Sequence, residues 1–561
     1  MTEASSSAKI VNVASRLKAV ARAMPDAVAV VEPRGHDRQG KRRYGTVTFR
    51  ELDRQSDRIA HGLRAMGVAP GTRLALLVPP GIDFVALVFA LFKAGAVAIL
   101  IDPGMGRRNV LRCLAEAEPE GFIAVPLVHA LRTLFRGRFP KARFHVTVGR
   151  RWFWGGVTLD DLRAGPGDGG EPVPAAADDP AAILFTTGST GPPKGVQYSH
   201  GNFAAQVDEL RERFGIRPGE VDLATFPLFG LFNAALGVST VVPEMDPTRP
   251  ARADPLKILA AAQDWSITQA FGSPALWNTV GRYCAERGLR LPTLRRVFSC
   301  GAPVPAEVLE AMQGCIHPEG EVHTPYGATE ALPVASISAR EVLGETAAQT
   351  RQGAGVCVGR RFPGITWRVI RIVDGPIATT AEAEPLPPGE IGELVVRGAV
   401  VTRRYVTRPG SNALAKIADG SGFWHRMGDA GYLDPQDRFW FCGRVAHRVL
   451  TAARPMYTIC CEAIFNQHPD VYRSALVGVG PRGSQRPVVV LEPRPGCFPR
   501  TAAERSRLLA EIGQLGRANP LTAAIEDFLF HPGLPVDIRH NAKIFREKLA
   551  VWAARRVGPG R

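Results

Sequence analysis

The stretch from Phe84 to Ile101 constrains the fold most, because it is the most apolar part of the chain. Lys93 and Gly95 interrupt it, so neither part reaches the about 20 uninterrupted apolar residues that a membrane-spanning helix needs. We therefore expect a buried helix followed by a buried strand. Residues 1–180 alternate helical and strand-like patterns around this stretch, with a helical pattern from Phe49 to Ala65. This alternation predicts an α/β fold with layered parallel strands.

Two connectors rich in Pro, Gly and Ala interrupt the pattern, at residues 165–179 and 375–390. A smaller α/β unit begins after Gly443 and Arg444. We expect a large N-terminal domain over residues 1–443 and a small α+β C-terminal domain over residues 444–561. The N-terminal domain is expected to comprise two layered α/β subdomains and a β-rich subdomain, at about 1–180, 181–370 and 371–443.

Composition excludes several classes of protein. Hydrophobic residues make up 45% and charged residues 22% of the 561 residues, which excludes wholesale disorder and a fibrous chain. Lys and Arg exceed Asp and Glu by 16, and the simpler interpretation of these scattered residues is a basic surface. The alternative is attraction to anionic partners, namely nucleotides, acyl carboxylates, phospholipid surfaces or nucleic acid, although no motif supports nucleic-acid binding. The nine cysteines include no C-x-x-C pair, and residues 1–18 carry no apolar signal segment. These features predict a cytoplasmic protein without a transmembrane segment.

A loop rich in glycine and hydroxyl residues follows the strand expected at 181–185. Its glycines let backbone N–H groups converge on phosphate oxygens, its hydroxyls add donors, and Lys194 adds a positive charge. Gly follows Lys194 where a Walker A motif has Ser or Thr, so this is a different phosphate loop. Ser199 is expected to cap a helix that reaches Phe214. The candidate phosphate-binding residues are Thr186, Thr187, Gly188, Ser189, Thr190, Gly191 and Lys194.

Further motifs follow in a fixed order. They are SCGAP at 299–303, PYGATE at 325–330, GELVVRG at 392–398, WHRMGD at 424–429, Gly443-Arg444 and LPVDIRHNAKIFR at 534–546. Together with the loop they resemble the adenylate-forming superfamily of acyl-CoA synthetases, peptide-synthetase adenylation domains and firefly-type luciferases. The resemblance covers nearly the whole chain, and it implies ATP and Mg²⁺ as cofactors. It also implies that residues 1–443 form an AMP-binding and acyl-substrate domain and that residues 444–561 form a C-terminal lid domain.

The resemblance also implies residue roles. Tyr326 would stack on adenine, Thr329 would bond the α-phosphate, and Glu330 would hold Mg²⁺ together with Thr187. Asp429 would bind the ribose hydroxyls, and Arg444 would contact the ribose near the interdomain hinge. Further nucleotide contacts would come from Gly301, Ala302, Pro303 and Gly327. The catalytic residues would be Lys543, as the adenylation lysine, with Lys194, Thr329 and Glu330.

The chemistry of carboxylate activation needs the same groups. Transfer of a carboxylate to the α-phosphate of ATP forms a mixed anhydride and expels diphosphate. The protein must offset the phosphate charge with lysine, hydroxyl donors and Mg²⁺ held by a carboxylate. Each residue alone has a simpler interpretation, for example a turn residue at Asp429 or a solvated lysine at Lys543.

The sequence departs from the superfamily pattern at several positions. Gly230 stands where many relatives have a histidine, which suggests either drift or a differently shaped acyl pocket. After Arg444, the usual acidic pair is Ala446-His447, and the usual lysine and glycine are Leu450 and Ala453. In thioester-forming relatives this segment serves the attack by coenzyme A, so the change weakens the case for a thioester step. Asn541-Ala-Lys543 replaces the usual Ser-Gly-Lys, and Met427 replaces a threonine.

Within the superfamily, the chain most resembles the β-lactone synthetases of bacterial olefin biosynthesis. That resemblance implies an AMP-forming ligase that activates a long-chain 2-alkyl-3-hydroxyalkanoic acid, whose own 3-hydroxyl then closes a β-lactone. It also implies possible assembly with a thiolase-like condensing enzyme, a reductase and a β-lactone decarboxylase. The alternatives are a medium- or long-chain acyl-CoA ligase and an inactive nucleotide-binding scaffold. No general base is assigned: His425 and His447 are candidates, but a structural histidine is the simpler interpretation of each.

Overall fold

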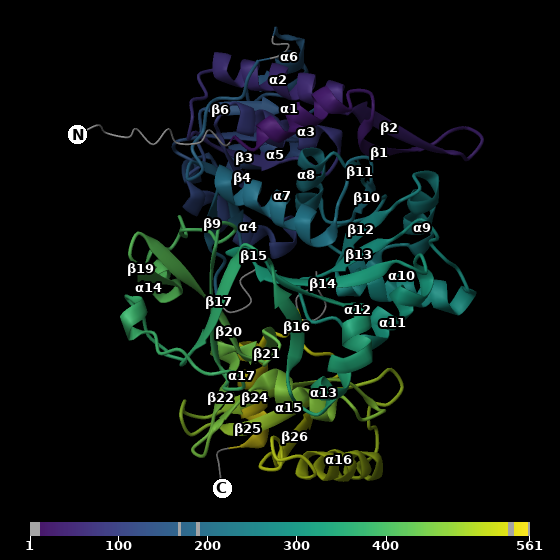
Figure 1. Ribbon diagram of the computed structural model, residues 1–561, viewed down its shortest axis with the longest axis vertical. Helices are drawn as coiled ribbons and strands as arrows, with labels where there is room; N and C mark the ends of the chain where they lie inside the picture. Colours follow the sequence, from purple (N-terminus) through teal and green to yellow (C-terminus); the bar gives the residue numbers. More distant parts are fainter. Residues whose placement is uncertain (1–11, 167–169, 187–190, 537–542, 559–561) are drawn as a thin grey trace.

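The computed structural model describes residues 12–166, 170–186, 191–536 and 543–558, without the side chains of residues 227–229. Two large sheets form the upper and middle parts of the molecule, and a small sheet with its helices lies at the bottom (Figure 1). The predicted α/β class is confirmed. In the described part of the chain, no helix is long and apolar enough to cross a membrane.

The first sheet has seven strands in the order β7-β6-β5-β3-β4-β8-β9, and all neighbours are parallel except β8 and β9. Its strands are β3 (Arg73–Leu77), β4 (Val97–Leu100), β5 (Gly121–Ala124), β6 (Phe144–Thr147), β7 (Val157–Thr158), β8 (Pro180–Phe185) and β9 (Gly195–Ser199). The accompanying helices are α1 (Ala14–Ala23), α2 (Phe49–Ala65), α3 (Ile82–Lys93), α4 (Arg107–Ala117), α5 (Pro126–Leu134) and α6 (Leu159–Ala164).

The second sheet runs from β17 through β18, β20, β21, β16, β15, β14, β13, β12, β10, β11 and β1 to β2, with β19 beside β20. Its early strands are β1 (Val28–His36), β2 (Arg42–Thr48), β10 (Val221–Ala224), β11 (Ser239–Val241), β12 (Gln269–Gly272), β13 (Arg296–Ser299), β14 (Glu321–Ala328) and β15 (Ala331–Ser338). Its later strands are β16 (Val356–Arg361), β17 (Ile365–Ile370), β18 (Gly392–Gly398), β19 (Lys416–Asp419), β20 (Gly422–Leu433) and β21 (Arg438–Arg444). The helices along this part are α7 (His200–Phe214), α8 (Pro227–Leu236), α9 (Pro255–Asp264), α10 (Pro274–Arg287), α11 (Ala306–Cys315), α12 (Ala339–Glu341), α13 (Ala347–Arg351) and α14 (Gly410–Ala415).

The C-terminal part contains the three-stranded sheet β24-β25-β26 and the short pair β22-β23. Its elements are β22 (Val449–Leu450), β23 (Pro455–Met456), α15 (Thr458–Phe465), β24 (Val471–Val479), β25 (Arg486–Pro493), α16 (Ala502–Arg517), β26 (Asp527–Phe530) and α17 (Arg546–Val557). The assignment of residues 444–561 as a lid stays a prediction.

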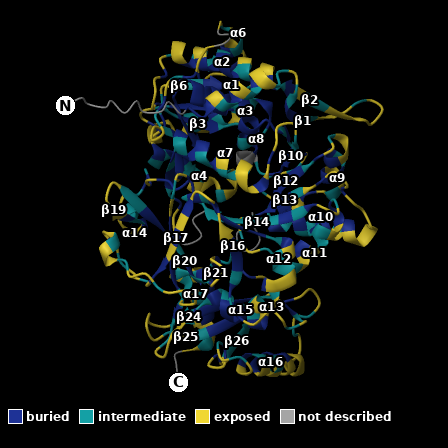
Figure 2. Cartoon of the chain, viewed as in Figure 1, coloured by how far each residue is buried: buried dark blue, intermediate teal, exposed yellow. Residues whose placement is uncertain are grey.

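Buried residues follow the central strands and the helices between the sheets, whereas the outer helix α16 carries many exposed residues (Figure 2). The apolar stretch at 84–101 forms α3 and β4, a buried helix followed by a buried strand, as predicted. Lys93, which interrupts this stretch, is itself buried, and its ammonium group donates to Asp53 at 2.5 Å and Asp57 at 2.6 Å. Both carboxylates lie on α2, so this lysine is paired within a buried polar cluster between two helices.

Candidate active site

The phosphate loop connects the antiparallel strands β8 and β9, which pair from Pro180–Ser199 to Phe185–Gly195. Thr186 closes the described part of the loop, because its backbone N–H donates to Lys194 O and its hydroxyl accepts from Lys194 N. Ser199 then caps α7 in a reciprocal pair with Asn202, as predicted. Thr187, Gly188, Ser189 and Thr190 lie outside the described residues, while Gly191 lies at the edge of the loop.

Tyr405, which the sequence analysis did not identify, contacts both Lys194 and Glu330. The Lys194 ammonium group lies 4.8 Å from the ring centroid of Tyr405, whose hydroxyl donates to Glu330 Oε1 at 2.6 Å. Burial lowers the pKa of Lys194, and the nearby Glu330 carboxylate opposes that shift. Tyr405 precedes α14 in an irregular segment, so no periodic pattern marks it in the sequence.

Thr329 and Glu330 form the turn between β14 and β15. Tyr198 on β9 donates its hydroxyl to Thr329 O at 2.6 Å, and Thr402 donates its N–H and its hydroxyl to Glu330 O, both at 2.9 Å. Two segments distant in sequence therefore hold this turn in place. Gly327 is required beside it, because a Cβ there would meet Ala331 O at 2.6 Å.

The surroundings of Glu330 suit the role of a magnesium ligand. Tyr405 uses one carboxylate oxygen, and Mg²⁺ is ordinarily held by one or two carboxylates, substrate phosphates and waters rather than by a cage of protein ligands. In keeping with that, no group of three or more His, Cys, Asp or Glu that could hold a metal occurs among the described residues.

The expected ribose site is a connected polar network. Asp429 on β20 and Arg444 at the end of β21 are cross-strand partners, and Arg444 donates to Asp429 Oδ1 at 2.7 Å. The Tyr326 hydroxyl donates to Asp429 Oδ2. Burial, followed by the Asp429 charge, raises the pKa of Tyr326 well above its ordinary value. Gly428 has φ +66°, and a Cβ there would lie 3.3 Å from the Arg444 guanidinium, so glycine permits this close approach.

The adenine-side loop lies one strand away from Tyr326. Gly301, Ala302 and Pro303 follow the end of β13, which pairs in parallel with β14. Gly301 adopts φ +98°, which favours glycine. The structure therefore brings residues 301–303 and Tyr326 together at the carboxyl ends of two neighbouring strands.

Lys543 lies in the segment that leads into α17. The bridge between Val536 and Ile544 holds this segment, and Arg546 pairs with the buried Glu462 at 2.6 Å. Glu547 accepts from His447 at 3.1 Å, and His447 follows Arg444 by three residues. The Lys543 segment is thus anchored next to the predicted hinge. Whether Lys543 acts in adenylation stays a prediction.

The two candidate proton acceptors have low basicity. His425 is buried, with Nδ1 3.0 Å from Ala415 O, and burial holds its pKa well below 6.5. Burial and the nearby Arg546 charge lower the pKa of His447 to about 4. Both are therefore neutral near pH 7, and their surroundings agree with the structural interpretation.

A second missed residue is Lys416, which pairs with His425 across β19 and β20. Its buried ammonium group donates to Thr402 O, and burial lowers its pKa to about 7. Since Thr402 donates twice to Glu330 O, Lys416 lies behind the turn that presents Glu330. No motif marks this lysine in the sequence.

An apolar cavity adjoins the adenine-side motifs. Cys300 and Pro325, which lie directly before Gly301 and Tyr326, form part of its wall. Its other lining residues are Gln206, Leu210, Ile216, Asp222, Phe232, Asn233, Leu236, Gln269, Phe271, Phe298, Leu332 and Pro333. Burial raises the pKa of Asp222 to about 7. The cavity thus offers an apolar chamber with a carboxyl group in its wall that is largely protonated below pH 7.

Gly230 does not line this cavity. It lies in α8, and a Cβ there would meet Thr240 at 3.2 Å and Ala224 at 3.3 Å. The missing side chain therefore faces β10 and β11, where it allows α8 to pack closely on the sheet. This packing explains the glycine without a change in the acyl pocket.

Residues 17–406 match the family model described as AMP-binding enzyme. The chain is 48% identical to an olefin β-lactone synthetase of Xanthomonas campestris pv. campestris, over 97% of each chain. It is 30% identical to a feruloyl-CoA synthase of Amycolatopsis sp., over 80% of this chain and 84% of that protein. The amide bond synthetase McbA of Marinactinospora thermotolerans has the same fold, with a TM-score of 0.78, 22% identity and coverage of 96% of this chain and 99% of that one. The chain belongs to the AMP-binding, adenylate-forming enzyme family.

Proposed function

We propose that this AMP-forming ligase uses ATP and Mg²⁺ to convert a long-chain 2-alkyl-3-hydroxyalkanoic acid into a β-lactone, AMP and diphosphate. The observation that carries the proposal is the 48% identity to an olefin β-lactone synthetase over nearly the full length of both chains. The apolar cavity beside the nucleotide motifs supports an alkyl substrate, since an apolar chamber favours burial of an alkyl chain.

The first step joins the substrate carboxylate to the α-phosphorus of ATP and breaks its bond to the β-phosphate bridging oxygen. Lys194 and Lys543 offset negative charge on the phosphates, and Thr329 donates to the α-phosphate. Asp429 and Arg444 orient the ribose, and Tyr326 stacks on adenine. Mg²⁺ held at Glu330 supplies further charge neutralisation when bound.

In the second step the substrate's 3-hydroxyl oxygen attacks the activated carbonyl carbon. The bond from that carbon to the phosphate oxygen breaks, AMP leaves, and the hydroxyl proton passes to the phosphate. His425 and His447 are not needed for this transfer. An intramolecular nucleophile needs no coenzyme A, which is consistent with the altered residues after Arg444. Orientation in the cavity favours ring closure over attack by water.

The C-terminal part would act as a lid that moves about residues 444–448. Its docking in this arrangement involves Asp374, which accepts from Arg448 at 2.6 Å and from Arg482 at 3.1 Å. We place the enzyme in the cytoplasm, with the condensing, reducing and decarboxylating enzymes of olefin formation as candidate partners. All nine cysteines lie in the described part of the chain and none is in a disulfide, which is compatible with a reducing compartment.

Product analysis tests this function. The protein is incubated with ATP, Mg²⁺ and a 2-alkyl-3-hydroxy acid, with and without coenzyme A, and AMP, thioester and lactone are quantified. We expect lactone and AMP without coenzyme A. The matched acid that lacks the 3-hydroxyl should release diphosphate once per enzyme and then stop. A thioester formed only with coenzyme A would instead establish an acyl-CoA ligase.

A further inference from the structure

An exposed apolar surface lies at the edge of the first sheet opposite the phosphate loop. Six large apolar side chains form it, with exposed fractions between 42% and 77%: Leu127, Leu131, Leu134, Phe135, Trp152 and Phe153. We call these six residues the α5 patch. Large contiguous apolar surfaces are uncommon on monomeric proteins and ordinarily mark a contact site.

The α5 patch is held together by one buried tryptophan. Leu127, Leu131 and Leu134 follow helical spacing on α5, so they share one face. Trp154 stacks on His129 of α5 with ring centroids 5.5 Å apart, and it also contacts Trp152 at 5.3 Å and Phe153 at 5.2 Å. Trp154 thereby fixes the loop after β6 against α5.

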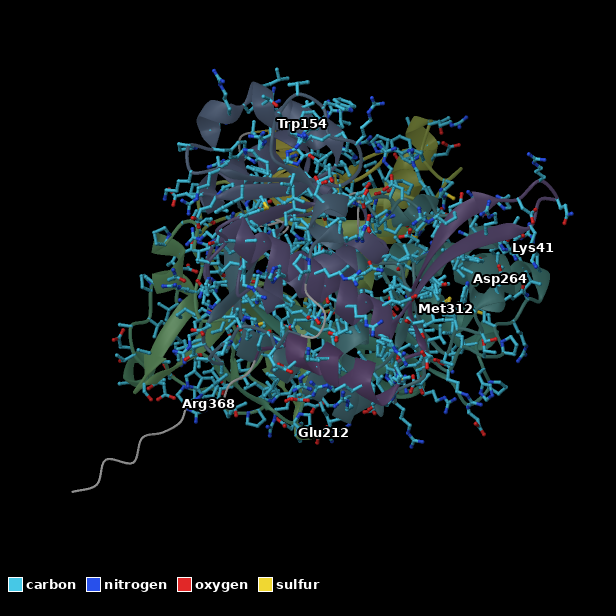
Figure 3. All side chains as sticks on the ribbon, turned by 90° about the horizontal axis from the view of Figure 1, so that it is seen from above. Lys41, Trp154, Glu212, Asp264, Met312 and Arg368 are labelled. Carbon is cyan, nitrogen blue, oxygen red and sulfur yellow. The ribbon has the colours of Figure 1, made fainter. Side chains whose placement is uncertain are left out.

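Hydrogen bonding keeps this arrangement in place. Trp154 Nε1 donates to Thr147 Oγ1 at 2.9 Å, and His129 Nε2 lies 2.9 Å from Val146 O. Seen from above, Trp154 lies at the edge of the molecule opposite Glu212 (Figure 3). The patch is therefore a supported surface feature.

The segment that carries the α5 patch is rich in basic residues, and acidic residues flank it at both ends, with Asp160 and Asp161 directly after it and Arg151 near Asp161. Residues 121–159 contain no Asp or Glu, and they contain seven basic residues: Arg132, Arg136, Arg138, Lys141, Arg143, Arg150 and Arg151. This segment supplies a charge of +7 toward the +16 of the chain, so the basic residues are less evenly scattered than the sequence analysis inferred. Lys141 and Arg143 pair with Glu118 and Glu120, which precede the segment. Arg136, Arg138 and Arg150 are exposed around the apolar side chains.

The first sheet separates the α5 patch from the phosphate loop. The strand β6, which leads into the Trp152 loop, lies near one edge of the sheet, and β8 and β9, which flank the phosphate loop, lie at the other. Changes at the α5 patch should therefore leave the nucleotide site intact.

We propose that the α5 patch docks the protein on the surface of an anionic phospholipid bilayer. Leucine and aromatic side chains would enter the boundary between headgroups and acyl chains, while the surrounding arginines contact lipid phosphates. Tryptophan suits this boundary because its ring is apolar and its edge is polar. A protein partner would commonly present both charge signs, whereas an anionic leaflet matches a segment without carboxylates. The proposal does not rest on the proposed function.

Vesicle co-sedimentation of the full chain tests the proposal. The vesicles contain phosphatidylcholine with about one third phosphatidylglycerol, and pure phosphatidylcholine is the uncharged comparison. We expect the protein to bind the anionic vesicles and to be released as salt rises through about 0.1–1 M, where the Debye length shortens from about 10 Å to 3 Å.

The Leu131→Glu/Leu134→Glu/Phe153→Glu variant should bind at least about tenfold more weakly. The matched control Leu256→Glu/Leu289→Glu/Val551→Glu makes the same charge change at exposed apolar residues elsewhere. The logarithm of its vesicle affinity should fall by less than half as much as that of the patch variant. Diphosphate release with a short soluble acid serves as a check that both variants are folded. Equal weakening by the patch and control variants would overturn the proposal.

Two further results would also overturn the proposal. One is failure to sediment with anionic vesicles at low salt. The other is a dimer in light scattering that the patch variant converts to a monomer, which would make the α5 patch an interface between copies of the chain.

Discussion

The nucleotide side of the site and the neighbouring cavity differ in how their buried polar atoms are hydrogen-bonded. Asp429 accepts from Tyr326 and Arg444, and both its carboxylate oxygens are used. In the cavity, Asp222 Oδ1 and Gln206 Oε1 are buried without a hydrogen-bond partner. The first region holds charged groups in one geometry, whereas the second is an apolar chamber. Variants that remove charge should therefore have their largest effects on the nucleotide side.

The largest expected effect is at Glu330. Glu330→Gln keeps the shape of the side chain but removes the charge that would hold Mg²⁺, so diphosphate release should slow by about 10²–10³-fold. The exposed Glu390→Gln variant is the control and should retain the wild-type rate. A normal rate in Glu330→Gln would remove this residue from the metal site.

Lys543→Ala should come next. Loss of a positive charge that offsets negative charge in the transition state should slow adenylation by about 10²-fold, while the ATP Kd changes less than about threefold. Single-turnover diphosphate release and nucleotide binding separate the two quantities. Lys548→Ala, on the exposed start of α17, is the control. Equal losses in rate and ATP affinity would instead indicate a binding role for Lys543.

Tyr405→Phe should have a smaller effect, because it keeps the ring beside Lys194 and removes one hydrogen bond to a carboxylate. Such bonds contribute about 1.5–3 kcal/mol, and we expect about a tenfold loss in turnover together with a higher Mg²⁺ requirement. A Mg²⁺ titration of kcat checks this. Tyr283→Phe is the control, and an unchanged Mg²⁺ requirement in Tyr405→Phe would show that this hydroxyl does not position Glu330.

The smallest effect on turnover is expected at Asp222, where stability is the informative quantity. Burial raises the Asp222 pKa from 3.8 to about 7, so the folded state favours the protonated acid. That contribution is complete below about pH 4 and is lost as pH rises toward 7, by at most about 4 kcal/mol. Asp222→Asn should therefore gain unfolding free energy relative to wild type across this range.

Denaturant unfolding at several pH values measures the Asp222 effect. Asp264→Asn provides a control of opposite sign, because Arg42 lowers the pKa of Asp264 and its contribution is lost as pH falls through the acidic range. A pH-independent difference between Asp222→Asn and wild type would contradict an acid that is neutral in the cavity wall.

Local signals predicted several elements closely. The helix expected from Phe49 to Ala65 has those bounds as α2, because apolar spacing is reinforced by a capping box at Thr48. Ser199 and Asn202 likewise begin α7, and the strand expected at 181–185 is β8. These features depend on residues a few positions apart, so a single sequence contains the necessary information.

Contacts between distant segments could not be predicted in this way. β1 pairs with β11 across about two hundred residues, so an N-terminal strand joins the second sheet rather than the first. Tyr405 and Lys416 reach the Glu330 turn from an irregular segment and an edge strand. Their roles arise from position in space, and neither has a distinctive sequence neighbourhood.

The sequence by itself determined the family, the order of the nucleotide motifs and the helices and strands that carry them, because these are encoded in short contiguous strings. The tertiary structure decided which side chains support those motifs, which way the missing side chain of Gly230 faces, and that the exposed residues of α5 and of the loop after β6 form one surface. Packing brings these groups together over long sequence separations, and only the folded chain fixes their distances, burial and charge.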